Sequence, residues 1–244
     1  MTASEIEVPV GPHEDEPHVR GFNNRLNWLR AAVLGANDGI VSTAGIVIGA
    51  AGATSDRNAI MIAGVAGLAA GAMSMGAGEY VSVSTQRDSE LALLAKERRE
   101  LREEPEEELA ELAGLYAAKG LSDDLALEVA TVLTAKDALA AHAEVELGID
   151  PDDISSPWHA AWASMVSFTI GALLPLLTMV LTPVGVSAWL TVAVVVLALA
   201  VTGWVSARLG YSSPPRAVAR NVAGGLFAMA ITYAIGAALG TQIG

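Results

Sequence analysis

The stretch LRAAVLGANDGIVSTAGIVIGAAGA, residues 29–53, decides the fold of this chain. It is long enough to cross a bilayer, because a helical span needs about 20 mostly apolar residues. It nevertheless carries one carboxylate, Asp38, between Asn37 and Gly39. A charge inside the membrane costs roughly 2.5–3.5 kcal/mol on insertion scales, so such an acid is a functional-site hypothesis. The alternatives are a structural hydrogen bond to a neighbouring helix and a position near the lipid headgroups.

Four further apolar stretches follow, at about residues 59–83, 158–182, 187–207 and 217–241. With the first stretch they predict an all-α membrane protein with five transmembrane helices. Residues 1–17 are polar, acidic and contain three prolines, so we expect a disordered tail. Residues 18–28 have apolar side chains at helical spacing, which indicates an interfacial helix or a simple extension of the first span. The predicted membrane parts are therefore residues 18–83 and residues 158–244.

Residues 84–157 separate the second span from the third and hold 7 basic and 19 acidic side chains. Pro105 and the glutamates after it predict a helix start, Gly120 its end, and Ser122 the cap of the next helix. Together with a continuation of the second span to about Glu103, these signals predict a three-helix acidic hairpin domain. Its charge disfavours nucleic acid and favours cations. The chain has no cysteine, which excludes disulfides and thiolate metal sites.

The basic residues predict which way the chain crosses the membrane. If the N-terminus is cytosolic, the outer loops hold a single basic residue, Arg57. All other lysines and arginines then lie on the cytosolic side, as the positive-inside rule requires. The acidic domain is therefore expected in the cytosol and the C-terminus outside.

Glutamates in the acidic segment have spacings that suit a metal site. Two pairs are each three residues apart and so share a helix face, and a further glutamate has a histidine one turn before it. The candidate ligands are Glu97, Glu100, Glu108, Glu111, Glu146 and His142. Oxygen ligands with at most one imidazole suit Mn²⁺ or Fe²⁺ better than Cu⁺. A glutamate-rich helix is more often a solvated face, and the spacing alone leaves both interpretations open.

A row of residues on one face of the second span also indicates a metal site. Gly67, Gly71, Met75 and Glu79 are each four residues apart. The glycines allow another helix to approach closely, and the other end presents a thioether and a carboxylate. Counted from the cytosolic ends of their spans, Asp38 and Met75 both lie about 12 Å deep. An acid with a thioether favours a transition metal over Mg²⁺ or Ca²⁺, although a methionine alone is more often core.

The stretches GANDGIVSTAGIVIGAAGA and GAMSMGAGEYVSVSTQRDSE and the glutamate-rich hairpin ending in ELG resemble the vacuolar iron transporter family. The resemblance covers about residues 25–242. It implies a homodimer that moves Fe²⁺, and often Mn²⁺, out of the cytosol in exchange for protons along a path between subunits. It implies a hairpin metal site at the five glutamates and a path through Asp38 and Met75, to which we add Glu79 and Asn37. Plant members place a methionine pair just before the last glutamate, whereas this chain has His142 and Ala143.

The predicted function is a secondary transporter that exports Fe²⁺ or Mn²⁺ for detoxification and homeostasis, in a bacterial cytoplasmic membrane. The alternative is a membrane-anchored metal buffer or sensor, but an anchor has no use for Asp38. An enzyme such as a ferroxidase is disfavoured, because no Glu-x-x-His pair is present. The expected partners are divalent metal ions, protons, the lipid bilayer and a second copy of the chain. No permanently bound cofactor and no nucleic acid are expected.

Overall fold

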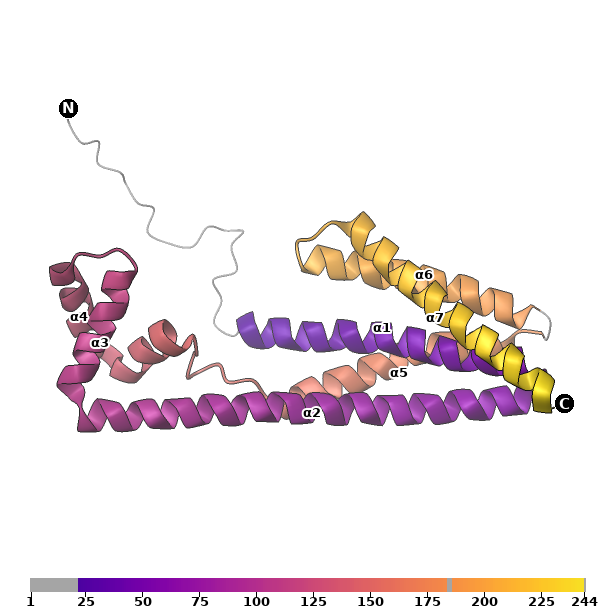
Figure 1. Ribbon diagram of the computed structural model, residues 1–244, viewed down its shortest axis with the longest axis horizontal. Coiled ribbons are helices and arrows are strands. Elements are labelled where there is room, and N and C mark those ends of the chain that lie inside the picture. The colour runs from indigo at the N-terminus through magenta and orange to yellow at the C-terminus, as the bar shows by residue number, and fades with distance from the viewer. Residues whose placement is uncertain (1–21, 184–185, 244) are drawn as a thin grey trace, which may run out of the picture.

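The computed structural model describes residues 22–183 and 186–243. The predicted disordered tail, residues 1–17, and the first residues of the predicted interfacial helix lie outside this part. The described elements are α1 (Phe22–Ala53), α2 (Arg57–Glu103), α3 (Pro105–Ala118), α4 (Asp123–His142), the π-helix η1 (Ala143–Leu147), α5 (Pro157–Leu181), α6 (Ser187–Leu209) and α7 (Pro214–Ile243), as drawn in Figure 1.

Five of these helices, α1, α2, α5, α6 and α7, are long and apolar enough to cross a membrane. This confirms the prediction of an all-α membrane protein with five spans. Aromatic side chains mark the two ends of the bundle, as they do at membrane interfaces. The rings of Tyr80 and Trp158 lie 4.7 Å apart at the end nearer α3 and α4. Trp189 and Tyr233 are exposed at the opposite end.

Helix α1 packs against every other helix of the bundle. Its glycines allow these contacts. A Cβ atom on Gly39 would overlap the carbonyl oxygen of Phe168 on α5. A Cβ atom on Gly236 of α7 would overlap the carbonyl oxygen of Gly49 on α1. Backbones approach this closely only where both helices carry small residues, so the glycine pattern of α1 fixes where its neighbours lie.

Helix α2 has 47 residues, about 70 Å at 1.5 Å per residue, and is more than twice as long as a membrane span. Its apolar first half lies along the bundle, and its charged second half projects beyond it (Figure 1). Helices α3 and α4 and η1 fold back against the projecting half. Gly120, with φ +105°, makes the turn between α3 and α4, and Gly148, with φ +66°, ends η1.

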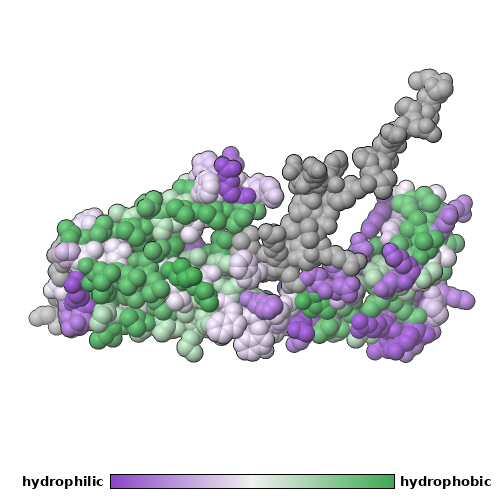
Figure 2. Space-filling model, turned by 180° about the vertical axis from the view of Figure 1, so that it is seen from behind, coloured by the Kyte–Doolittle hydropathy of each residue, from purple (hydrophilic) through white to green (hydrophobic). Residues whose placement is uncertain are grey.

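The surface reflects this division of α2. Figure 2 shows apolar side chains over most of the bundle and hydrophilic side chains over the projecting part. At the far end of the bundle, Asp56 caps α2 by accepting a hydrogen bond from the Asn58 amide. The guanidinium of Arg57 donates to the Thr182 carbonyl oxygen and so ties the start of α2 to the end of α5.

Candidate metal sites

Three side chains from three helices meet at one buried point of the acidic segment. They are Glu97 of α2, Glu108 of α3 and His142 of α4, which are 2%, 6% and 0% exposed. One potential ligand atom from each lies within 4.8 Å of the other two. Oxygen and nitrogen ligands bind divalent ions at about 2.0–2.6 Å, so two ligands on opposite sides of an ion are about 4–5 Å apart. The three groups therefore fit around a single ion with little movement.

His142 is at the centre of this cluster. Its Nδ1 atom lies 3.0 Å from Glu97 Oε1, 3.5 Å from Glu108 Oε2 and 3.7 Å from Glu146 Oε2. Nevertheless, the contact between Nδ1 and Glu97 Oε1 does not have hydrogen-bond geometry, and neither these two atoms nor His142 Nε2 has a hydrogen-bond partner among the described residues. Buried polar atoms in folded proteins nearly always have a partner. A cation held between these atoms would supply the missing interaction.

The charges of the cluster also favour a cation. Burial, followed by the negative charges of Glu146 and Glu108, raises the pKa of Glu97 to about 7. Burial is also the largest cause of the raised pKa of Glu108. A divalent ion stabilises the charged carboxylates, whereas a proton neutralises them. Metal and protons therefore compete for the same oxygens near neutral pH.

The local sequence explains how the groups converge. Glu97 lies on the projecting half of α2, and Pro105 in the first turn of α3 reverses the chain so that Glu108 returns to it. His142 is the last residue of α4, and Glu146 follows in η1. π-Helical turns are rare and are frequently found at functional sites. The cluster thus takes one group from each of three α-helices, with a fourth group close by on η1.

Two predicted ligands do not belong to the buried cluster. Glu100 pairs with Lys96, whose Nζ lies 2.7 Å from Glu100 Oε2 at the exposed surface of α2. Glu111 is exposed on α3. Both are close enough for their charges to raise the pKa of Glu108. The structure therefore brings together Glu97, Glu108 and His142, places Glu146 beside them, and leaves Glu100 and Glu111 at the periphery.

In the described part of the membrane bundle, the carboxylate of Asp38 has one hydrogen-bond partner. Ser42 Oγ donates to Asp38 Oδ1 at 2.5 Å, within the same helix. Among the described residues, Asp38 makes no hydrogen bond to a neighbouring helix, which was the structural alternative for this acid. The sequence prediction missed Ser42, although its position four residues after Asp38 puts it on the same face of α1.

The antiparallel register of α1 and α2 sets the level of Asp38. A Cβ atom on Gly67 of α2 would meet the side chain of Ile46 on α1. Met75 lies eight residues from Gly67 along α2, toward the acidic segment. Asp38 lies eight residues from Ile46 along α1, in the same direction. Equal steps at 1.5 Å per residue give both residues the same depth. The register thus agrees with the depth counted from the sequence.

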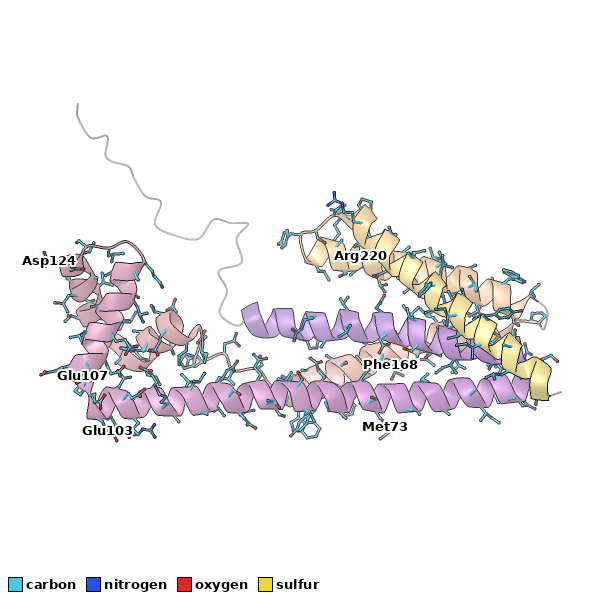
Figure 3. The ribbon with its side chains drawn as sticks, in the orientation of Figure 1. Met73, Glu103, Glu107, Asp124, Phe168 and Arg220 are labelled. Atoms are coloured by element: carbon cyan, nitrogen blue, oxygen red, sulfur yellow. The ribbon has the colours of Figure 1, made fainter. Side chains whose placement is uncertain are left out.

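Helix α5 lies between α1 and α2 at this level. Cβ atoms on Gly39 of α1 and Gly71 of α2 would both meet Phe168 of α5, and Met75 packs against the same cluster. Figure 3 shows Phe168 between the two helices. Among the described residues, no further acid or histidine joins Asp38 in a metal-binding group. One chain therefore presents Asp38 without completing a ligand sphere around it.

The other two predicted path residues are Asn37 on α1 and Glu79 on α2. Asn37 precedes Asp38, and the Oδ1 atom of Asn37 is buried without a hydrogen-bond partner in the described structure. Glu79 lies one turn beyond Met75, beside Tyr80, whose ring packs against Trp158. Glu79 is therefore at the aromatic end of the bundle, between Asp38 and the acidic segment.

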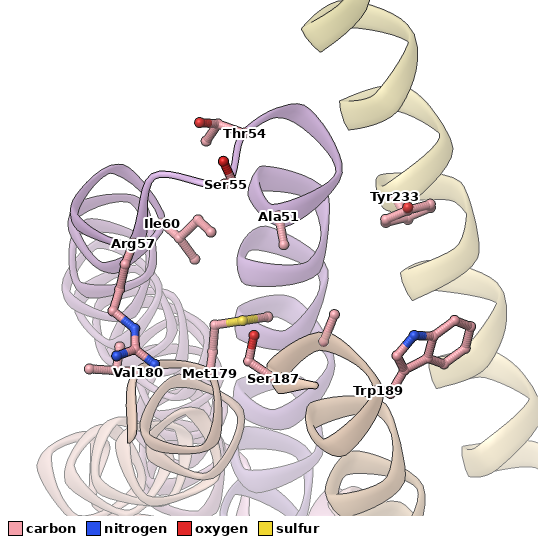
Figure 4. A pocket seen from close by; sticks show the side chains of 11 residues that line it. Ala51, Thr54, Ser55, Arg57, Ile60, Met179, Val180, Ser187, Trp189 and Tyr233 are labelled. Carbon is pink, nitrogen blue, oxygen red and sulfur yellow. The ribbon is translucent and has the colours of Figure 1, made fainter. Parts of the chain in front are cut away.

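The pocket in Figure 4 lies at the opposite end of the bundle and has a volume of about 180 Å³. Its lining offers hydroxyls and the thioether of Met179, but no carboxylate or imidazole. The cationic guanidinium of Arg57 also lines it. This pocket is therefore a poor site for a divalent cation.

Comparison with known proteins identifies the family of this chain. The model of the VIT family matches residues 29–237. The chain belongs to the VIT family. The resemblance inferred from its NDG and GEYVS stretches is thus confirmed, and membership of this family of transporters confirms that the chain is not an enzyme.

Three relatives show how far the VIT family match extends. The vacuolar iron transporter of Acanthamoeba castellanii is 42% identical over 218 residues, which cover 86% of this chain and 77% of the relative. Vacuolar iron transporter homolog 5 of Oryza sativa subsp. japonica is 38% identical over 86% of this chain and 80% of its own length. Vacuolar iron transporter homolog 1 of Arabidopsis thaliana is 32% identical over 93% of this chain and 91% of its own length. These VIT family matches include both the bundle and the acidic segment.

Proposed function

We propose that this chain is a secondary transporter that exports Fe²⁺ or Mn²⁺ from the cytosol in exchange for protons. It is an integral membrane protein of a metal-transporter family, and relatives are named as vacuolar iron transporters. The observation that carries the proposal is Asp38, a carboxylate within a membrane span whose close partner in the described structure is a single hydroxyl. Acids in such positions mark ion and proton pathways.

The proposed path uses Asp38 with Met75 at the same depth, and Glu79 and Asn37 beside them. A thioether next to a carboxylate favours a soft transition metal over Mg²⁺ and Ca²⁺. A transport site must bind an ion well enough to admit it and weakly enough to release it. A single acid with a single thioether meets this requirement better than a complete cage of carboxylates.

The buried cluster would act before the path. Glu97, Glu108, His142 and Glu146 would bind the ion and raise its concentration at the cytosolic mouth. Glu100 and Glu111 would add negative charge at the edge of the site. Along α2 the cluster is 18 residues from Glu79, or about 27 Å, so binding and passage are separate steps.

A second copy of the chain would complete the path. Small side chains on one face of the membrane half of α2 are exposed, among them Ala66, Ala69, Ala70, Ala77 and Gly78. Met73, on the same side of α2, points away from the bundle in Figure 3. Such faces favour close helix–helix contact in membranes. We propose a homodimer in which these faces meet, with the metal path between the two subunits.

Protons are the proposed driving force, because export against the membrane potential is costly. One charge costs about 2.3 kcal/mol per 100 mV, and a divalent ion twice as much. The sequence has no G-x-x-x-x-G-K-[ST] loop for ATP. A carboxylate that binds either a proton or a metal ion couples the two flows in opposite directions. The proposed setting is a bacterial cytoplasmic membrane, with the acidic domain in the cytosol and a role in detoxification and homeostasis.

The alternative function is a metal buffer or sensor anchored by the bundle. One observation favours it: the buried cluster is formed within one chain and needs no second subunit. Membrane flux separates this function from transport, because a buffer binds metal without moving it.

The test uses the full chain in sealed liposomes that contain a metal indicator and a pH dye. We would add Fe²⁺ or Mn²⁺ on the side equivalent to the cytosol, without a pH gradient. Transport in exchange for protons predicts metal entry with a matching exit of protons. Binding without entry would support the buffer, and entry without proton movement would exclude the exchange.

A further inference from the structure

Another pocket opens at the end of the bundle nearer the acidic domain, between α1, α6 and α7. It has a volume of about 350 Å³. Its polar lining consists of Arg30, Asn37, Ser206 and Asn221, and Val33 and Leu34 contribute apolar wall. The pocket shares Asn37 with the candidate path, but its lining contains no carboxylate and no imidazole.

Two groups in this pocket lack a partner among the described residues. Asn37 Oδ1 is buried and has no hydrogen-bond partner. The guanidinium of Arg30 is exposed and takes part in no ion pair of the described structure. Buried amides normally have a hydrogen-bond partner, and an arginine guanidinium is well suited to pair with a phosphate, so the combination suits a ligand with both a negative charge and a polar headgroup.

The chain supplies no anion of its own on two of the three helices that form the pocket. Residues 154–244 contain three arginines and no aspartate or glutamate, although the whole chain has a net charge of −13. The three arginines, Arg208, Arg216 and Arg220, lie at the α6–α7 connection, and Figure 3 shows Arg220 near the start of α7. Figure 2 shows hydrophilic side chains gathered at this corner of an otherwise apolar bundle surface. Helices α6 and α7 therefore supply no anion to the arginines at this corner.

We propose that this pocket binds the phosphate of an anionic membrane phospholipid. The phosphate would pair with Arg30 and accept hydrogen bonds from Asn221, and the acyl chains would lie against Val33 and Leu34. A lipid fits better than a free anion because the pocket borders the apolar surface: Leu34 is 54% exposed there, and Trp204 is exposed on the same end of α6. Basic pockets between transmembrane helices on the cytosolic side bind anionic headgroups in this way.

The lipid would lie next to the candidate path, because Asn37 and Asp38 are neighbours on α1. An occupied pocket would hold α1 against α6 and α7 at the level of Asp38. The binding itself does not depend on transport. Failure of the proposed function and failure of this inference are therefore separate results.

The test is native mass spectrometry of the full chain released from detergent, with phosphatidylglycerol or phosphatidylcholine added at matched amounts. We expect phosphatidylglycerol to remain bound preferentially. The variant that combines Arg30→Gln with Asn221→Ala should lose this lipid by about fivefold or more, which is the effect of one cationic side chain near an anionic surface. Arg30→Lys keeps the charge and should retain most of the binding.

Arg208→Gln is the matched control, because Arg208 lies at the same end of α6 but does not line the pocket; its guanidinium stacks 5.3 Å from the Trp204 ring. It removes the same charge and should leave lipid binding within about twofold. Thermal unfolding of each variant checks that the bundle is intact.

Three results would overturn the proposal. The first is equal binding of the two lipids, and the second is equal loss in Arg208→Gln and the pocket variant. The third is binding of glycerol 3-phosphate that displaces phosphatidylglycerol at similar concentration, since this would identify a site for free anions. Preferential lipid binding that depends on Arg30 and Asn221 supports it.

Discussion

The membrane bundle and the acidic segment each contain candidate metal ligands, but they present them in opposite ways. In the bundle, Asp38 has Ser42 as its close partner, and its prospective metal neighbour, Met75, is on another helix beside Phe168. In the acidic segment, three side chains from three helices each place one potential ligand atom within 4.8 Å of the other two. One region offers an incomplete site and the other an almost complete one.

The two regions also differ in how tightly their helices pack. Glycines bring the bundle helices into backbone contact, so their positions are fixed and little room is left for polar groups. The acidic segment has a small core around Leu112 and Ala130, with a polar cluster beside it. This contrast suits a weak, shared site for passage and a stronger site for gathering, as we propose.

The largest expected effect comes from Asp38→Asn, which keeps the shape of the side chain and removes its charge. If Asp38 is the passage site, transport into liposomes should be lost at every metal concentration, because Glu79, the other acid of the proposed path, lies nearer the acidic segment and is not at the level of Asp38. Metal binding by the acidic segment should be unchanged in the same preparation. Asp56→Asn, an exposed acid at the far end of the bundle, is the control and should transport normally. Normal transport by Asp38→Asn would remove the contrast between the two sites.

The next effect distinguishes the buried cluster from its periphery. Glu97→Gln removes a buried ligand charge and should weaken Fe²⁺ or Mn²⁺ binding by about tenfold or more, measured by calorimetry on the full chain. Glu111→Gln removes the same charge from an exposed position and should weaken binding by less than about threefold. Transport by Glu97→Gln should slow at low metal and recover at high metal. Equal effects of both substitutions would mean that diffuse charge, and not a built site, attracts the ion.

The third prediction concerns pH. The pKa of Glu97 is raised to about 7, and Glu100, Glu108, His142 and Glu146 face it. Metal affinity should therefore fall by about tenfold per unit as pH drops below 7, because a proton must leave when metal binds. A raised folded pKa also means that the metal-free protein loses stability as pH rises from about 4.5 to about 7.

These two pH effects have separate measurements. Calorimetry at several pH values gives the slope of affinity, and thermal unfolding with and without metal gives the stability. Added Mn²⁺ should remove most of the loss of stability at pH 8, because it neutralises the cluster. A metal affinity that is flat between pH 5.5 and 7 would show that Glu97 is not a ligand.

The smallest expected effect tests whether close contacts at glycines fix the positions of the bundle helices. Gly39→Ala places a Cβ atom against the Phe168 carbonyl oxygen and should destabilise the bundle by about 1–3 kcal/mol. Gly78→Ala is the matched control, because a Cβ atom there meets nothing within 4 Å, and alanine favours a helix by up to about 1 kcal/mol. Unfolding in detergent measures the change in stability of each variant. If the two variants unfold alike, close glycine contact does not fix the bundle.

The sequence by itself determined the five spans and the helix boundaries around them. Hydrophobic stretches of fixed length and the signals at Pro105 and Gly120 depend only on neighbouring residues, so no tertiary information was needed. It also determined the depth of Asp38 and Met75, because the rise per residue of a helix is constant. The family was recognisable for a similar reason, since its motifs are continuous stretches of the chain.

Only the tertiary structure decided which glutamates share a site. Glu97 and Glu100 have the same spacing signal, yet Glu97 is buried against His142 and Glu100 pairs with Lys96 at the surface. The spacing of three residues puts both on one broad face of α2, but the way in which α3 and α4 pack against α2 buries only one of them. This arrangement arises from packing between distant segments, and so does the position of Phe168 between α1 and α2. Contacts of this kind have no local signal in the sequence, because each depends on side chains far apart along the chain.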